Sequence, residues 1–203
     1  MNRIRIAPIV EGHGEDQAIR TLIQRIWQEM LGGEYADVIK PIRGKRNTLV
    51  RREELTRAIH FALLKAGSPS TENAPLLVLV LLDADKEIPC VLGPALLALA
   101  KEIRADADIA CVVANVEYET WFAAAAESLA DYLLIAPGEN IPQNPEQSRS
   151  GKGWVKQHFI GGERYSETVD QARMTARMDL TLCRRRSPSF DKLCRELERR
   201  RGQ

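Results

Sequence analysis

Leu76-Leu77-Val78-Leu79-Val80-Leu81-Leu82, followed at once by Asp83-Ala84-Asp85, is the stretch that decides the fold of this 203-residue chain. Seven apolar residues are too few to cross a membrane, and a run of this length favours a strand buried on both faces. Such strands belong to parallel sheets that helices cover on both sides. The sequence therefore predicts an α/β protein with two acids at the end of a central strand.

A second apolar run, Ile4–Val10, also ends in acid, at Glu11-Gly12-His13-Gly14-Glu15. Right-handed crossovers put the carboxyl ends of parallel strands on one edge of the sheet. With the common strand order 2-1-3-4, Glu11 lies beside Asp83 and Asp85 at the edge where open α/β sheets bind ligands. We expect three carboxylates to meet there.

Helical spacing and further apolar runs complete an alternating pattern. We expect strands over 36–42 and 109–114, and helices over 15–31, 51–66, 94–103 and 119–134. This order predicts a Rossmann-like parallel sheet of about four strands flanked by helices. The polar stretch 43–47 is interpreted as a loop.

The amino-acid composition changes after residue 135, and three prolines fall within 136–153. We interpret 1–135 as the catalytic core, 136–153 as a linker or long loop, and 154–203 as a basic helical extension packed on the core. Helices are expected over 166–178 and 187–200, with Ser187 as N-cap and Pro188 in the first helical position.

The net charge of +1 hides an asymmetry. Residues 150–203 hold 13 Lys and Arg against 7 Asp and Glu, whereas 1–149 hold 16 against 21. An acidic core with a basic tail suits a metal-dependent enzyme that acts on a polyanion. The triplet Arg199–Arg201 alone is better interpreted as a solvated helix end. Aromatic residues form only 5% of the chain, which argues against an extended surface for stacking single strands.

The four cysteines are scattered without a CxxC pair, which argues against a zinc site or a disulfide framework. We expect reduced packing residues in a cytoplasmic protein. Met1 is followed by a charged strand and not by a signal peptide, and no apolar stretch is long enough to span a membrane. A membrane partner is therefore not expected.

Glu11, Asp83 and Asp85 are the candidate metal ligands, and Glu15, Glu117 and Glu119 are possible additions. Crowded carboxylates repel one another, and Mg²⁺ or Mn²⁺ bound through oxygen relieves that repulsion. In an extended segment, the side chains of Asp83 and Asp85 would point to the same side and grip one ion. The alternative is that these acids cap helix N-termini.

The segments Val10–Glu15 and Leu82–Asp85 resemble the two signature motifs of the Toprim domain, which occurs in topoisomerases, bacterial primases, recombination proteins and OLD-family nucleases. Three further segments extend the resemblance, to a bacterial Toprim-like family of unknown function that is often encoded beside an AAA-type ATPase. They are Val113–Phe122, Gly151-Lys152-Gly153 and Cys183–Phe190.

This resemblance implies a general acid/base or metal-ligand role for Glu11 and metal-ligand roles for Asp83 and Asp85. Glu117 or Glu119 would serve a second ion, so that two metals clamp the attacking and leaving oxygens of a phosphodiester. The chain lacks the tyrosine nucleophile module of topoisomerases and has no Walker A motif, so neither strand passage nor an ATPase of its own is expected.

Four basic residues are candidates for binding substrate phosphate: Lys152, Arg184, Arg185 and Arg186. Guanidinium groups beside a helix N-terminus suit a phosphate group. Lys152 could equally lie on a solvated surface, and one of the arginines could pair with the acidic site.

The leading hypothesis is a Mg²⁺- or Mn²⁺-dependent nuclease or phosphodiesterase that acts on DNA or RNA, with an AAA-type ATPase as a possible partner in phage defence or repair. The alternative is a non-catalytic module that binds metal or a partner. A phosphatase or phospho-acceptor domain ranks last, because such domains usually have an aspartate where this chain has Glu11. The sequence leaves open whether the chain forms a homo-oligomer.

Overall fold

The computed structural model describes residues 3–67, 75–135, 141–147, 150–160 and 164–201. Five strands form one parallel sheet in the order β2-β1-β4-β5, with β3 also paired to β1. The strands are β1 (Arg3–Val10), β2 (Tyr35–Val38), β3 (Ile42–Arg43), β4 (Leu76–Asp83) and β5 (Asp108–Ala114). The predicted α/β class is confirmed. The prediction that the first and third main strands, β1 and β4, are neighbours is confirmed as well.

The second predicted strand, 36–42, is two short strands. Ile39 still donates its N–H to the carbonyl of Ile6, but Pro41 has no N–H to donate, and the ladder resumes only at Ile42. Strand β3 then pairs with the last residues of β1. This pairing carries the following turn to the carboxyl edge of the sheet.

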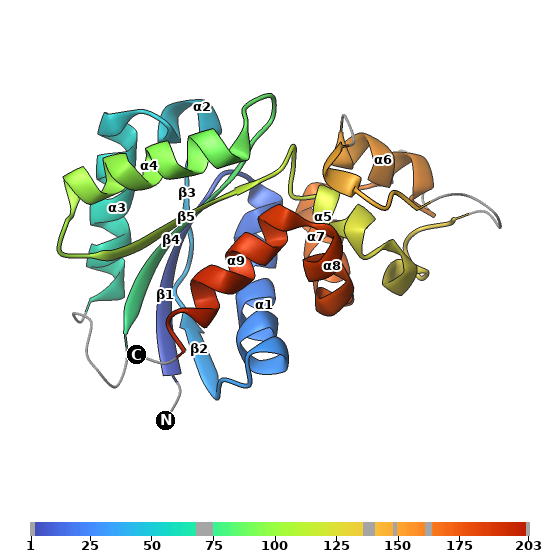
Figure 1. Ribbon diagram of the computed structural model, residues 1–203, viewed down its shortest axis with the longest axis horizontal. Helices are drawn as coiled ribbons and strands as arrows, with labels where there is room; N and C mark the ends of the chain where they lie inside the picture. The colour runs from blue at the N-terminus through green and yellow to red at the C-terminus, as the bar shows by residue number, and fades with distance from the viewer. Residues whose placement is uncertain (1–2, 68–74, 136–140, 148–149, 161–163, 202–203) are drawn as a thin grey trace.

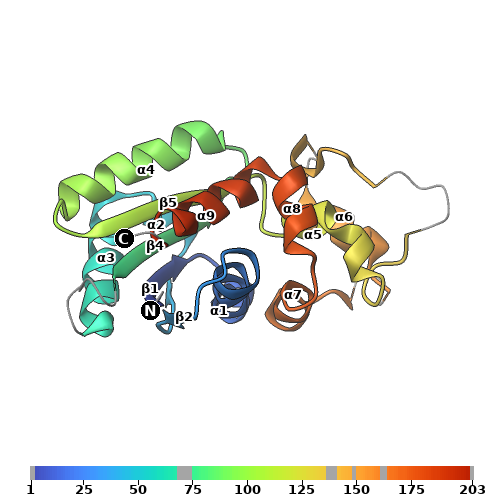
Figure 2. The same ribbon diagram turned by 60° about the horizontal axis from the view of Figure 1, so that its bottom comes forward.

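Helices cover both faces of the sheet (Figures 1 and 2). On one face lie α1 (His13–Arg25), the π-helical turn η1 (Ile26–Met30) and α9 (Pro188–Glu198), and on the other lie α3 (Arg52–Ala66) and α4 (Pro89–Ile103). Alternate residues of β4 enter the two cores: Leu77, Leu79 and Leu81 face α1, whereas Val78, Val80 and Leu82 face α3. The central strand is thus buried on both faces, as predicted.

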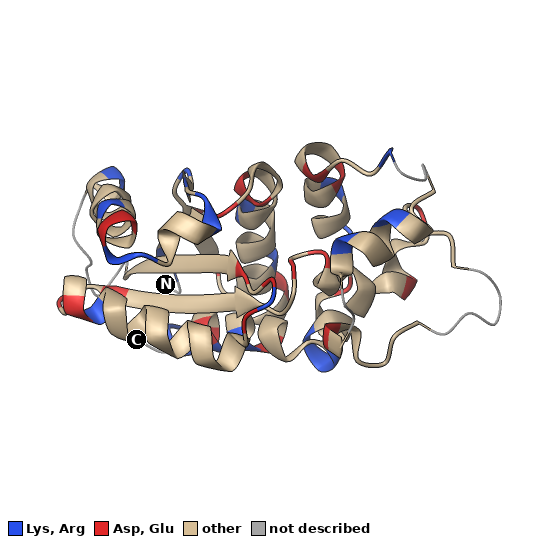
Figure 3. Cartoon of the chain, turned by 90° about the horizontal axis from the view of Figure 1, so that it is seen from above, with Lys and Arg blue, Asp and Glu red and all other residues tan. Residues whose placement is uncertain are grey.

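Short helices gather beyond the carboxyl ends of the strands (Figure 3). They are α5 (Thr120–Ala124), η2 (Ala126–Leu129), η3 (Pro145–Gln147), α6 (Gly151–His158), α7 (Glu167–Thr175) and α8 (Leu180–Arg186). Helix α7 packs along α1. A further short helix, α2 (Arg46–Leu49), follows β3 within the stretch expected to be a loop.

Two predicted helices have different bounds. Helix α4 begins at Pro89 and not at Pro94, because Pro89 takes the first helical position and Pro94 is accommodated inside the helix. The predicted helix over 119–134 is broken into α5 and η2. There the Ser128 hydroxyl donates to the carbonyl of Ala125 at 2.6 Å, a local bond that competes with regular helix.

The C-terminal segment shares the core of the sheet. Ser187 caps α9 as predicted, its hydroxyl oxygen accepting the N–H of Phe190 at 3.1 Å. Helix α9 buries Phe190, Leu193, Cys194 and Leu197 against the sheet. Of the predicted linker 136–153, residues 136–140 and 148–149 lie outside the described residues, and α6 begins inside it at Gly151.

All four cysteines are free; Cys111, Cys183 and Cys194 are buried and Cys90 is exposed. Within the described ranges, no helix combines the length and apolarity needed to cross a bilayer.

Candidate functional site

Acidic residues collect where strands β1, β4 and β5 end (Figure 3). Val10 pairs with Leu81, and Asp83 pairs with Ala114, so Glu11 and Asp83 leave neighbouring strands at the same edge. The first helical turn after β1 adds Glu15. The segment after β5 adds further acids, as the alternation of strands and helices predicted.

Asp83 is the centre of this cluster. Burial raises the pKa of its carboxyl well above the ordinary value, and the charges of Glu15, Glu119 and Glu11 raise it further. The backbone N–H of Tyr118 donates to Asp83 Oδ1 at 2.9 Å and opposes that rise. The carboxyl of Asp83 therefore interacts electrostatically with three other acids.

Glu15 is buried in the first turn of α1. Its Oε2 accepts the N–H of Glu11 at 3.0 Å and that of Gly12 at 2.6 Å. Burial, together with the charges of Glu11 and Glu119, nevertheless raises its pKa to about 7. Glu15 was predicted as an addition to the ligand set, and it lies inside the cluster.

Glu119, rather than Glu117, lies among these acids. Its buried Oε1 accepts the hydroxyl of Tyr165 at 2.9 Å, and burial raises its pKa despite the nearby ammonium group of Lys152. Glu117 instead accepts the Ser150 hydroxyl at 3.0 Å and the N–H of Lys152 at 2.8 Å, at the start of α6. The sequence could not distinguish between the two glutamates.

The carboxyl group of Glu11 is half-buried and incompletely paired. Its pKa is raised by burial and by the charge of Asp85, while Arg46 and the backbone amide of Asp83 lower it. Its Oε2 atom is buried and has no hydrogen-bond partner among the described residues. A buried carboxylate oxygen without a donor is costly and suits a cation.

Asp85 does not continue the strand as the extended D-x-D geometry required. Its φ is +53°, and its N–H donates to the carbonyl of Val116, whose φ is +62°. A positive φ is rare for a β-branched residue, and such strain concentrates at functional sites. The exposed carboxylate of Asp85 turns toward Arg46, with 3.4 Å between Oδ2 and Nε.

Arg46 is the site residue that the sequence did not indicate. Its guanidinium donates to the carbonyl oxygens of Asp83 and Ala84, both at 2.9 Å. It helps to line a cavity of about 450 Å³ at the sheet edge, together with Glu11, Gly12, Lys45, Asn47 and Asp85. An arginine in a polar stretch has no sequence pattern that marks it as a site residue. Its position at the sheet edge could have been predicted only from the pairing of β3 with the end of β1.

The basic residues expected to bind phosphate lie in different places. Arg184 pairs with Asp191 at 2.8 Å and Glu198 at 3.0 Å, and Arg186 pairs with Glu127 at 2.7 Å. Arg185 is exposed on α8. Lys152 pairs with Glu167 at 2.9 Å, and the charge of Glu119 helps to raise its pKa. Of these four residues, Lys152 lies beside the acidic cluster.

The donor chemistry of the cluster is that of a hard divalent cation, because its side chains offer carboxylate oxygens. In the described part of the chain, no three His, Cys, Asp or Glu side chains are arranged closely enough to hold a metal ion as they stand. Burial and the charges of neighbouring acids raise the pKa values of Glu11 and Glu15, and Glu11 Oε2 has no hydrogen-bond partner among the described residues.

A family model described as "Domain of unknown function (DUF4276)" matches residues 10–198. The chain belongs to this family. The match includes every residue of the acidic cluster, as well as Arg46 and the C-terminal helices. No curated protein and no solved structure matches the chain.

Proposed function

We propose that this DUF4276 protein is a Mg²⁺- or Mn²⁺-dependent phosphodiester hydrolase that acts on nucleic acid. The observation that supports the proposal is the acidic cluster at the ends of β1, β4 and β5, where burial raises the pKa values of four acids, Glu11, Glu15, Asp83 and Glu119. Within this cluster, one buried carboxylate oxygen of Glu11 has no donor among the described residues. Perturbed carboxyl groups at the ligand-binding edge of a parallel sheet are typical of an active site.

The electrostatics favour a cation over a purely structural role. Buried acids that repel one another must either take up protons or share a positive ion. Near neutral pH the ordinary solution is a divalent cation, which prefers oxygen ligands and keeps water on its open positions. Glu11 and Asp83 would hold this ion, and Asp85 would join them once its carboxylate turns away from Arg46. Glu15 or Glu119 would complete a site for two.

When bound, the ion would polarise a phosphoryl oxygen and lower the pKa of a bound water molecule. The chain's own groups would orient the substrate. Lys45 lines the cavity beside Glu11 and Asp85, where a cation can pair with a phosphate. Arg46 lies next to it but is held by the carbonyl oxygens of Asp83 and Ala84 and by Asp85. Lys152 lies beside Glu119, whose pKa its charge lowers.

The substrate class rests on the resemblance of the two acidic motifs to the Toprim domain, whose members act on nucleic acid. An AAA-type ATPase as a separate partner belongs to the same proposal, because the Toprim-like family that the chain resembles is often encoded beside one.

The test is a plasmid-nicking assay in Mg²⁺ or Mn²⁺ with Glu11→Gln and Asp83→Asn. Both substitutions keep the size of the side chain, and asparagine at position 83 can still accept the N–H of Tyr118. We expect at least a hundredfold loss of nicking with unchanged folding by circular dichroism. Asp106→Asn is the matched control, since Asp106 is an exposed acid that pairs with Arg104 before β5. Wild-type nicking that survives in Asp83→Asn contradicts the proposal.

A non-catalytic metal- or partner-binding module is the second candidate. It is favoured by the ion pairs of Lys152, Arg184 and Arg186, which leave these three residues less able to bind a phosphate backbone. Binding of Mn²⁺ without any nicking of DNA or cleavage of RNA would support this candidate over the hydrolase.

A further inference from the structure

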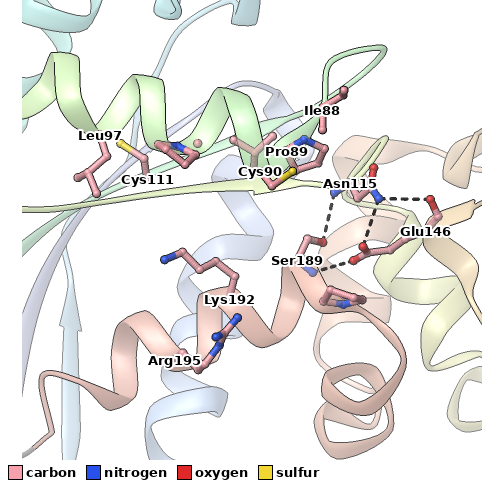
Figure 4. Close-up of a pocket in the computed structure, with 14 residues that line it drawn as sticks. Ile88, Pro89, Cys90, Leu97, Cys111, Asn115, Glu146, Ser189, Lys192 and Arg195 are labelled. Carbon is pink, nitrogen blue, oxygen red and sulfur yellow. Dashed lines mark hydrogen bonds between the residues drawn. The ribbon is translucent and has the colours of Figure 1, made fainter.

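A further hollow lies along the outer edge of β5, and none of the four acids of the cluster lines it. A groove of about 550 Å³ runs between α4 and α9, with Cys111 and Val113 of β5 on its floor. Figure 4 shows α4 on one side of this strand and α9 on the other. Its volume is within the range of about 300–1,000 Å³ that is usual for ligand clefts.

The floor of the groove is an unpaired strand edge. Among the described residues, strand β5 pairs with β4 alone, and the carbonyl of Ala114 accepts the N–H of Ala84 on that side. Backbone groups alternate between the two edges of a strand, so those of Cys111 and Val113 face outward. No backbone group of the described residues pairs with them. The next outward N–H, that of Asn115, is bonded to Ser189 Oγ at 3.2 Å, which closes one end of the edge.

The wall formed by α4 is apolar and partly open to solvent. Ile88 is 60% exposed at the mouth, and Cys90 and Leu97 line the groove beyond it. Gly93 faces the strand, with room for only a small side chain above the Cys111 carbonyl: a Cβ atom at Gly93 would lie 3.9 Å from that oxygen. Cys111 and Val113 are each 4% exposed, and the absence of a side chain at Gly93 leaves both of them lining the groove.

Of the charged residues that line the groove, two are cations and one, Glu146, is an acid whose carboxylate already accepts the N–H of Ser189 at 2.8 Å. Lys192 and Arg195 line the groove (Figure 4). Each shares its carboxylate partner with another cation: Glu196 also pairs with Arg199 and Arg200, and Asp191 also pairs with Arg184. The wall formed by α9 therefore favours acidic groups on whatever occupies the groove.

We propose that this groove binds an extended peptide segment of a partner protein, which adds a strand to β5. Main-chain hydrogen bonds to Cys111 and Val113 would provide affinity. Alternate side chains of the peptide would point to the two walls, so that apolar residues meet α4 and acidic residues meet Lys192 and Arg195. This proposal is independent of the metal site.

The probe is a nine-residue peptide of alternating valine and glutamate, compared with the same peptide carrying lysine in place of glutamate. Amide hydrogen exchange of the full-length protein is followed by NMR. We expect the glutamate peptide to slow exchange of the Cys111 and Val113 amides, with Val112, which already faces β4, unchanged. The lysine peptide should bind at least about tenfold more weakly. If neither peptide slows exchange at Cys111 and Val113, the proposal is wrong.

Two pairs of variants separate strand addition from other binding. Gly93→Leu fills the groove and should weaken the glutamate peptide at least about tenfold, whereas Gly93→Ala should not. Lys192→Glu should weaken it, whereas Lys156→Glu makes the same charge change on the exposed surface of α6, outside the groove, and should not. A peptide N-methylated at every internal amide should not bind. Equal binding of that peptide would mean that side chains alone are recognised and would overturn the proposal.

Discussion

At the scale of one residue, Glu15 shows how burial in the acidic cluster makes an ionised carboxylate unfavourable. Its carboxyl is almost fully buried, accepts two backbone N–H groups, and still has a pKa raised to about 7. Because the folded pKa lies above the unfolded one, the folded state holds the proton more tightly. The stabilising effect of that proton is complete at low pH and is lost as the pH rises through about 7.

Glu15→Gln should therefore stabilise the metal-free protein at pH 8 by about 2 kcal/mol, with little difference at pH 4.5. Glutamine keeps an acceptor for the two N–H groups but carries no charge. Urea unfolding in a chelator at the two pH values measures the effect. A variant that is less stable than the wild type at pH 8 would show that the carboxylate is stabilised by its surroundings. The carboxyl of Asp106 has a lowered pKa in the wild type, so Asp106→Asn should not increase the free energy of unfolding at pH 8.

At this scale the sequence revealed the acids but not their partners. Glu11, Asp83 and Asp85 follow apolar runs, so their place at the sheet edge could be predicted. The left-handed backbone of Asp85 could not, because the N–H of Asp85 donates to the carbonyl of Val116, in the segment that follows β5. Arg46 and Tyr165 reach the site through tertiary packing and have no local pattern.

Helix α9 illustrates what can be predicted at the scale of an element. Its start follows from Ser187 and Pro188, and its buried stripe follows from helical spacing. The division of the second strand needed knowledge of how Pro41 interrupts the ladder. Helices α6 and α8 were missed because each is shorter than nine residues and has few apolar repeats.

The cap of α9 gives a prediction at this scale. Ser187→Ala should cost about 1–2 kcal/mol, because the buried hydroxyl accepts the N–H of Phe190 and donates to Glu146. Ser166→Ala is the matched control, since Ser166 precedes α7 without a side-chain bond to that helix's N–H groups. Equal losses of stability in denaturant unfolding would contradict the assigned role of Ser187.

At the scale of the whole molecule, the C-terminal helices complete the site instead of forming a separate unit. Helix α7 packs along α1, and Tyr165 just before it bonds to Glu119. The contact between the two helices is close at Gly14, where a Cβ atom would lie 2.6 Å from the carbonyl oxygen of Glu167.

Gly14→Ala should therefore push α7 away from α1 and cost about 1–3 kcal/mol. The nearest atom to a Cβ at Gly12 is 3.6 Å away, so Gly12→Ala should be much milder. Thermal unfolding of both variants measures the difference. Equal stability of Gly14→Ala and the wild type would mean that the close packing of α7 on α1 does not require a glycine at position 14.

The central claim is that the crowded carboxylates share a divalent cation, and calorimetric titration with Mn²⁺ at pH 7 in two buffers of different ionisation enthalpy tests it most directly. We predict binding accompanied by net release of protons, because the cation displaces protons held by acids with raised pKa values. Asp83→Asn should bind at least about tenfold more weakly. Absence of binding, or equal binding by Asp83→Asn, would contradict the claim.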